Sequence, residues 1–144
     1  MTHTVQHAEG LISVRSSLPF AKTAACLLIA LERRGMTLHA RIDHAANASA
    51  AGLHLRPTQL FIFNYPEVEG HILALFPLMG LDLPRKIALW EDEAGVVWIS
   101  YDDPLWLGRR YGAPREVMAL LQPMATSFTG IALEAGGQSH PSPR

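Results

Sequence analysis

Two strand-like segments joined by a tight turn constrain the fold of this chain more than any other feature. Residues 85–91 and 96–101 are rich in Val, Ile, Trp and Tyr, and the turn-forming Asp92-Glu93-Ala94-Gly95 lies between them. Further strands are predicted at 11–15, 36–43 and 59–63, with helical patterns between them. A hairpin with segregated helices favours an α+β fold over a doubly wound parallel sheet.

Two longer segments carry apolar residues at helical spacing. One apolar face holds Phe20, Ala24, Leu27, Leu28 and Leu31, and a second holds Val117, Leu120, Leu121, Met124, Phe128 and Ile131. We expect a helix over each segment, with a kink at Pro123 in the second. Shorter helices are expected after Pro66 and Pro104, because proline suits the first helical turn.

The length of 144 residues suits one domain, which we place at 10–135. The segments 1–9 and 136–144 are polar or rich in Gly, Ser and Pro, so they are predicted to be flexible termini. The apolar run 24–31 begins too far into the chain for a signal peptide and ends at Glu32, so no leader and no membrane contact is expected.

Charge and cysteine usage exclude several classes of function. The formal net charge is -1, and no run of basic residues is longer than a pair, so nucleic-acid binding is not expected. The single cysteine, Cys26, lies in an apolar helical run and has no partner for an internal disulfide. These features favour a reducing compartment, and we expect a cytoplasmic location.

The segment 41–48 holds the main candidate for chemistry. An alternating strand gives way there to an alanine-rich helix, with Asp43 and His44 at the junction. The carboxylate could orient the imidazole, or the helix start could receive an anion. Alternatively, Asp43 or His44 caps the helix without any ligand. Neighbouring strand residues point to opposite faces, so the two side chains pair only where the strand breaks.

Two more polar residues flank the apolar strand at 59–63. Arg56 could clamp a carboxylate or phosphate, or it could pair with Asp43 or Asp82. Asn64 follows the strand and is expected to cap a helix. Because pockets form at the ends of core strands, Asp43, His44, Arg56 and Asn64 are predicted to bind a small polar or anionic ligand.

The sequence lacks the signatures of other common functional sites. The seven histidines show no His-Glu-x-x-His spacing, and there is no Cys-x-x-Cys pair, so no metal site is predicted. No Gly-x-Ser-x-Gly elbow or glycine-rich phosphate loop occurs, and no cofactor is expected. Trp90, Trp98 and Trp106 could line a pocket or a dimer contact, although core packing is the ordinary role of such residues.

Several short motifs together resemble one family, the bacterial and archaeal domain of unknown function 302. The matching pieces are Ile42-Asp43-His44, Ala48, Gly52-Leu53-His54-Leu55-Arg56-Pro57-Thr58, Pro66, Gly70, Leu81-Asp82-Leu83-Pro84, Trp90-Glu91-Asp92, Tyr101 and Arg110-Tyr111. The resemblance implies a fold like that of the TATA-binding protein, with a curved antiparallel sheet and helices on one side. It also implies a homodimer, but no activity.

The chain departs from the family pattern at two places. Family members tend to have Gly-Asn where this chain has Asn64-Tyr65, and Arg-His where it has Arg110-Tyr111. If the family used a second imidazole beside His44, this chain has lost it. A tyrosine can still donate and accept hydrogen bonds.

Three functions follow from these observations. The first is a homodimeric cytoplasmic domain that binds a small polar or anionic ligand. The second is an enzyme in which His44 is a general base oriented by Asp43. The third is a protein-interaction module whose aromatic hairpin forms the dimer.

Overall fold

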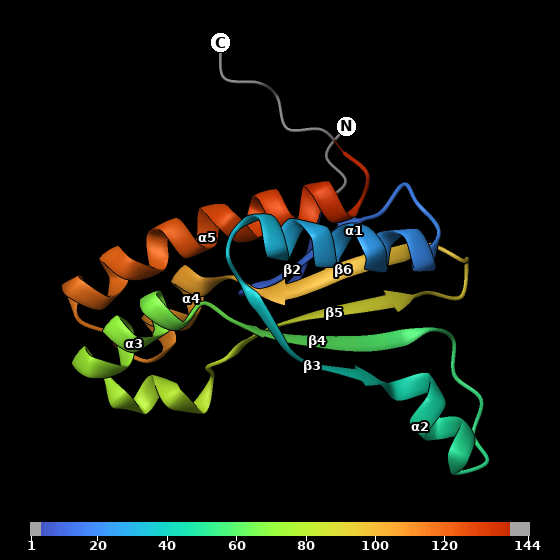
Figure 1. Cartoon of the computed structure of the whole chain (residues 1–144), viewed down its shortest axis with the longest axis horizontal. Coiled ribbons are helices and arrows are strands. Elements are labelled where there is room, and N and C mark those ends of the chain that lie inside the picture. The colour runs from blue at the N-terminus through green and yellow to red at the C-terminus, as the bar shows by residue number, and fades with distance from the viewer. Residues whose placement is uncertain (1–3, 139–144) are drawn as a thin grey trace.

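The computed structural model describes residues 4–138, apart from the side chains of Gln6 and His7, and its centre is a six-stranded sheet (Figure 1). The strands are β1 (Thr4–Ala8), β2 (Leu11–Arg15), β3 (Thr37–Asp43), β4 (Thr58–Asn64), β5 (Arg85–Glu91) and β6 (Val97–Asp102). Their order is β1-β2-β6-β5-β4-β3, and each neighbouring pair is antiparallel. The predicted α+β fold and its hairpin are confirmed.

Helices accompany the sheet throughout the chain. They are α1 (Phe20–Arg33), α2 (His44–Ala50), α3 (Pro66–Leu75), the 3-10 helix η1 (Pro77–Leu81), α4 (Pro104–Arg110) and α5 (Arg115–Ala135). Figure 1 shows α1 and α5 side by side along the sheet, while α2 extends from the end of β3. Pro123 lies within α5, as expected. Within residues 4–138, every helix is too short or too polar to span a bilayer.

The main core lies between one face of the sheet and the helices. Cross-strand partners on this face are Val14 with Ile99, Ile99 with Leu89, and Ile87 with Phe61. Each of these five side chains is at most 3% exposed. Leu27, Leu31, Leu121, Phe128 and Ile131 complete the core from α1 and α5, as their helical spacing predicted.

The other face of the sheet is only half-buried, although it is largely apolar. Register places the following residues on it, which we call the open face: Ala40, Ile42, Leu60, Ile62, Ala88, Trp90, Trp98 and Ser100. The exposed Lys86 lies opposite Ile62 on the same face. Antiparallel sheets usually present a polar face when no second layer covers them. The open face therefore differs from an ordinary solvent-facing sheet.

A β-bulge changes the faces predicted for β3. The sequence predicted Leu38, Ala40 and Ile42 on one apolar face, but the register shifts between Leu38 and Ala40. Ala40 and Ile42 consequently lie on the open face, opposite Ile62 and Leu60. Arg41 lies on the helix-covered face instead, with its guanidinium carbon 4.8 Å from the centre of the Phe61 ring.

The termini differ from the expected boundaries of 10 and 135. Thr4–Ala8 forms β1, which pairs with β2, so the sheet begins within the segment predicted to be flexible. At the other end, the carbonyl of Gly136 accepts hydrogen bonds from the backbone N–H and the hydroxyl of Ser17. The rest of the predicted flexible ends, 1–3 and 139–144, lies outside the described residues.

Candidate functional site

The predicted ligand-binding residues lie at two opposite ends of the sheet. Asp43 pairs with Gln59 near the start of β4, whereas Asn64 pairs with Thr37 at its end. Asn64 lies five residues after Gln59 along the extended strand, which corresponds to about 17 Å. The structure thus keeps Asp43, His44 and Arg56 at one end and places Asn64 at the other.

Asp43 serves as the N-terminal cap of α2. Its Oδ1 accepts a hydrogen bond of 2.9 Å from the backbone N–H of Ala46, which satisfies one of the free donors of the first turn. His44, the first residue of α2, is exposed. The structure therefore shows the capping role that the sequence left open. Within residues 4–138, no contact joins the Asp43 carboxylate to the His44 ring.

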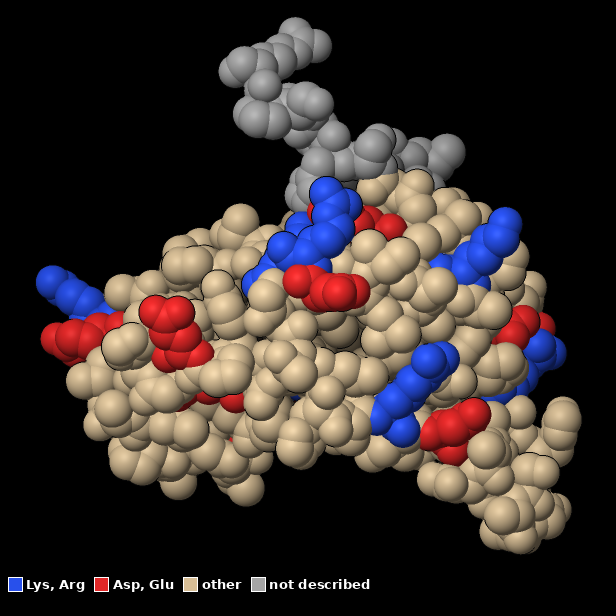
Figure 2. All heavy atoms as spheres, viewed as in Figure 1, with Lys and Arg blue, Asp and Glu red and all other residues tan. Residues whose placement is uncertain are grey.

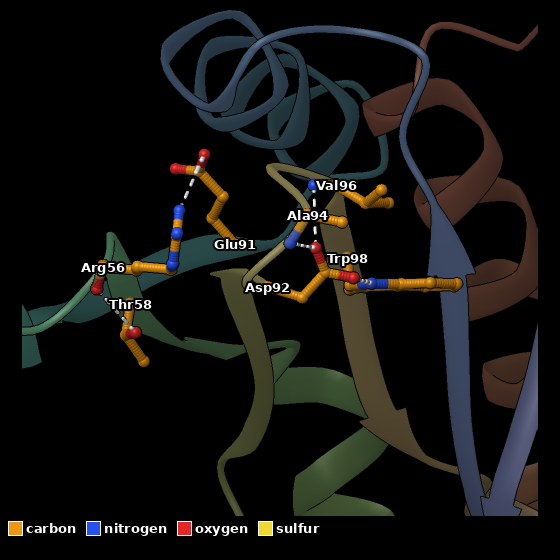
Figure 3. A network of polar contacts seen from close by, with 7 residues as sticks. All are labelled: Arg56, Thr58, Glu91, Asp92, Ala94, Val96 and Trp98. Atoms are coloured by element: carbon orange, nitrogen blue, oxygen red, sulfur yellow. Dashed lines mark hydrogen bonds and ion pairs between the residues drawn. The ribbon is translucent and has the colours of Figure 1, made fainter.

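The segment 44–57, which we call the arm, contains α2 and the chain leading to β4. No residue of the arm is buried, and Leu53 and Leu55 are 64% and 46% exposed. Arg56 contacts neither predicted partner, Asp43 or Asp82: its Nη1 lies 3.9 Å from Oε1 of Glu91 (Figure 3). The arm thus offers exposed polar and apolar groups together.

The two tryptophans of the hairpin lie next to the arm end of the sheet. Their rings stack with centroids 6.2 Å apart, and each indole donates a hydrogen bond. Trp90 Nε1 donates to Oγ of Ser100, and Trp98 Nε1 donates to Oδ2 of Asp92. The hydrogen bond from Trp98, joined by two from the backbone, holds the pKa of Asp92 below its ordinary value. Both rings are consequently fixed on the open face.

A buried arginine dominates the opposite end of the sheet. Arg85 is 3% exposed, its Nη2 donates to the carbonyl of Asp102 at 2.8 Å, and its guanidinium lies 5.5 Å from the centre of the Phe128 ring. Burial lowers the pKa of Arg85, while the carboxylates of Asp102, Asp82, Glu69 and Asp103 raise it. These acidic groups neutralise the buried guanidinium, so Arg85 itself is not available to an anionic ligand.

Glu69 of α3 is the second buried charge at this end. Its Oε1 accepts a hydrogen bond of 2.7 Å from the backbone N–H of Tyr65, which ties the first turn of α3 to the end of β4. Burial raises the pKa of Glu69, and nearby Arg85 opposes that shift. Oδ1 of Asn64 and Nε of Arg85 are buried without a hydrogen-bond partner among the described residues.

The motifs Leu81-Asp82-Leu83-Pro84 and Arg110-Tyr111 meet near Arg85. The Tyr111 hydroxyl donates a hydrogen bond to Oδ2 of Asp82, and Nη1 of Arg110 lies 3.6 Å from the same oxygen. That hydrogen bond, followed by burial, raises the pKa of Tyr111. Tyr111 therefore lies at the end of the sheet away from His44, and it does not occupy the place of a partner for that imidazole within one chain.

Sequence reasoning missed Arg85 and Glu69 as members of a site. A charged residue at the start of an apolar strand, or in the first turn of a helix, ordinarily faces solvent. The only sequence signal was the position of Arg85 directly after the Leu81-Asp82-Leu83-Pro84 motif. Across residues 4–138, no three His, Cys, Asp or Glu side chains are grouped so that they could hold a metal ion.

Comparison with known proteins gives a family match and a structural match. The model of the family described as domain of unknown function DUF302 matches residues 12–128. A crystal structure of an uncharacterized conserved DUF302 protein from Bacillus stearothermophilus superposes with a TM-score of 0.81 over 89% of this chain and 99% of that one. The sequence identity is 16%, so this likeness shows the fold alone.

Curated relatives extend the comparison. Proteins from Brucella suis and Brucella abortus, each named fluoride-specific ion channel FluC 1, are 34% identical over 129 residues. The match covers 90% of this chain and 51% or 48% of those proteins, so the chain spans about half the length of these relatives. Because the family model covers most of the sequence, the chain belongs to the family described as domain of unknown function DUF302.

Proposed function

We propose that this domain is a self-associating binding module, in which a second copy of the chain covers the open face. The observation that carries the proposal is the composition of that face. Eight residues on four neighbouring strands, including Trp90 and Trp98, present apolar or small side chains on the face of the sheet away from α1 and α5. Contiguous apolar surface of this kind is typical of a protein interface.

The size of the open face bears on how a dimer forms. The four strands that carry this face, spaced at about 4.8 Å and roughly 20 Å long, give an area of about 400 Å². Two copies would bury roughly 800 Å² in total, which is below the roughly 1,000 Å² of a specific interface, so the arm has to contribute to the contact. A symmetric contact uses the same surface on both copies, so one apolar face is sufficient.

The arm supports the same proposal. Helix α2 has seven residues, and a helix this short gains little stability without packing. It buries no residue within its own chain, and Leu53 and Leu55 beside it are exposed. Because α2 follows β3, which brings Ala40 and Ile42 to the open face, a second copy bound there is positioned to contact the arm as well.

Sedimentation equilibrium tests this proposal. The wild-type chain is expected to be dimeric at micromolar concentration, and Leu60→Glu, at the centre of the open face, is expected to be monomeric but folded by circular dichroism. Ile29→Glu is the matched control, because Ile29 is 54% exposed on α1, away from the open face. A monomeric wild-type chain, or equal dissociation by both variants, contradicts the proposal.

Ligand binding by Asp43, His44, Arg56 and Asn64 stays a prediction, and so does catalysis by His44. If a ligand binds near the arm, NMR titration with a metabolite library should shift His44 and Arg56 together. Asn64 should remain unchanged in one chain, because it lies at the other end of the sheet. The Asp43 carboxylate already accepts from Ala46, so a general base at His44 needs another orienting group.

A second candidate function is supported by the curated relatives. We infer that the domain acts beside an ion channel, because proteins named fluoride-specific ion channel contain a matching region in about half their length. The cytoplasmic location, itself still a prediction, would place it on the inner side of the membrane. Deletion of the chain is expected to lower fluoride tolerance of the host cell. Unchanged tolerance would count against this function.

A further inference from the structure

A short segment of the structure presents three leucines to solvent. Leu75, Leu78 and Leu81, which we call the leucine lobe, are 53%, 62% and 77% exposed. They lie within seven residues at the end of α3 and along η1. Single exposed apolar residues are common, but three large ones gathered on one lobe indicate a binding surface.

The lobe is held in place by its own buried residues. Ile72 precedes the leucines by one helical turn, Met79 lies between Leu78 and Leu81, and both Ile72 and Met79 are fully buried. The backbone N–H of Met79 donates to the carbonyl of Phe76, and that of Asp82 donates to Met79. The leucines are thus presented by an anchored turn rather than by a free loop.

Basic and aromatic side chains border the lobe. Leu78, Leu81, Arg110 and Tyr111 line a cleft of about 260 Å³, and the Arg110 side chain is 57% exposed. Arg109 precedes it and is also exposed. The Asp82 carboxylate accepts from the Tyr111 hydroxyl and lies 3.6 Å from Nη1 of Arg110. In Figure 2, the part of the molecule where η1 lies is largely tan, without a dense cluster of charges.

We propose that the leucine lobe docks on the surface of an anionic lipid bilayer. Leucines inserted at the boundary between headgroups and acyl chains would leave water, while Arg109 and Arg110 would face the lipid phosphates. Tyr111 has the apolar ring and polar hydroxyl that suit this interface. Such peripheral docking needs no membrane span, so it replaces the expectation of no membrane contact.

The inference deepens the channel-associated function proposed above and rests on it for the nearness of a membrane. It is independent of self-association, because the lobe lies on η1 and α3 and the open face lies on the strands. A monomeric Leu60→Glu variant should therefore still bind lipid.

Co-sedimentation with vesicles tests the proposal. The wild-type chain is expected to pellet with vesicles of phosphatidylcholine and phosphatidylserine, and much less with phosphatidylcholine alone. Leu78→Ser combined with Leu81→Ser is expected to lower the apparent affinity roughly tenfold or more, since two apolar side chains that would insert into the bilayer are lost. Arg110→Gln should weaken binding to the anionic vesicles only, and added salt should do the same.

Leu53→Ser is the matched control, because Leu53 is 64% exposed but lies on the arm. It should bind vesicles as the wild type does. The proposal is overturned if the wild type binds neither vesicle type, if it binds both equally, or if Leu53→Ser loses as much affinity as the double variant. Vesicle binding with unchanged fluoride tolerance would remove the channel-associated function alone and leave the lipid contact intact.

Discussion

The indole Nε1 of Trp98 donates a 2.9 Å hydrogen bond to Oδ2 of Asp92, while Oδ1 of the same carboxylate accepts from the backbone N–H groups of Ala94 and Val96 (Figure 3). One carboxylate therefore holds both the hairpin turn and a ring of the open face. Protonation of Asp92 would weaken all three contacts, because a neutral carboxyl is a poorer acceptor.

Acid should release Trp98 before the fold is lost. The pKa of Asp92 is lower in the folded chain than its ordinary value of 3.8, so its stabilising contribution is present above that value and is lost as the pH falls through the folded pKa. We expect near-ultraviolet circular dichroism of the tryptophans to change below pH 3.8. Asp92→Ala should show the change already at neutral pH. Glu93→Ala, the control in the same turn, should titrate as the wild type does.

Gly10→Ala should be much more destabilising than Gly52→Ala. Both glycines have φ near +80°, where an added side chain costs about 1–2 kcal/mol. A Cβ on Gly10 would lie 2.1 Å from Cδ2 of Trp106, whereas a Cβ on Gly52 meets nothing within 4 Å. The clash should add about 1–3 kcal/mol for Gly10→Ala alone. Urea unfolding measures the free energy of unfolding of both variants, and equal losses of stability would show that Trp106 moves aside at no cost.

The α+β fold could be predicted because its signals are local. The turn 92–95 and the apolar patterns of β5 and β6 are contiguous in sequence, and the structure has this hairpin. The partner of β1 could not be predicted, since Thr4–Ala8 is polar and its pairing with β2 is a tertiary event. The bulge at His39 is equally invisible in an alternating pattern, and it moved Ala40 and Ile42 to the open face.

The four predicted site residues do not lie together, because their expected grouping depended on the direction of the strands. Asp43 ends β3 and Asn64 ends β4, but antiparallel strands end on opposite sides of a sheet. The capping role of Asp43 was open to prediction, because Asp before an alanine-rich run is a common helix start. The burial of Arg85 was not, since it depends on Phe128 and on four carboxylates from three other segments.

Arg34 and Glu134 should couple α1 to α5. Nη1 and Nη2 of Arg34 donate to the two carboxylate oxygens of Glu134 at 2.9 and 2.8 Å, and both side chains are about a quarter exposed. A bidentate pair of this exposure is expected to contribute about 0.5–1 kcal/mol. A double-mutant cycle with Arg34→Ala and Glu134→Ala measures the coupling. A coupling energy near zero would mean that solvent and salt screen the pair.

Arg85→Met should destabilise the fold by about 2–4 kcal/mol, because several interactions are lost in a buried place. The variant loses the hydrogen bond to the Asp102 carbonyl and the contact with the Phe128 ring. It also leaves Glu69, whose pKa burial already raises, without the opposing charge, so that pKa should rise further. Lys22→Met, at an exposed position of α1, is the control, and its free energy of unfolding is expected to change by no more than about 0.5 kcal/mol. Urea unfolding compares the two variants, and NMR titration follows Glu69. If Arg85→Met equals or exceeds the wild type in stability, the cost of burying the guanidinium outweighs its contacts.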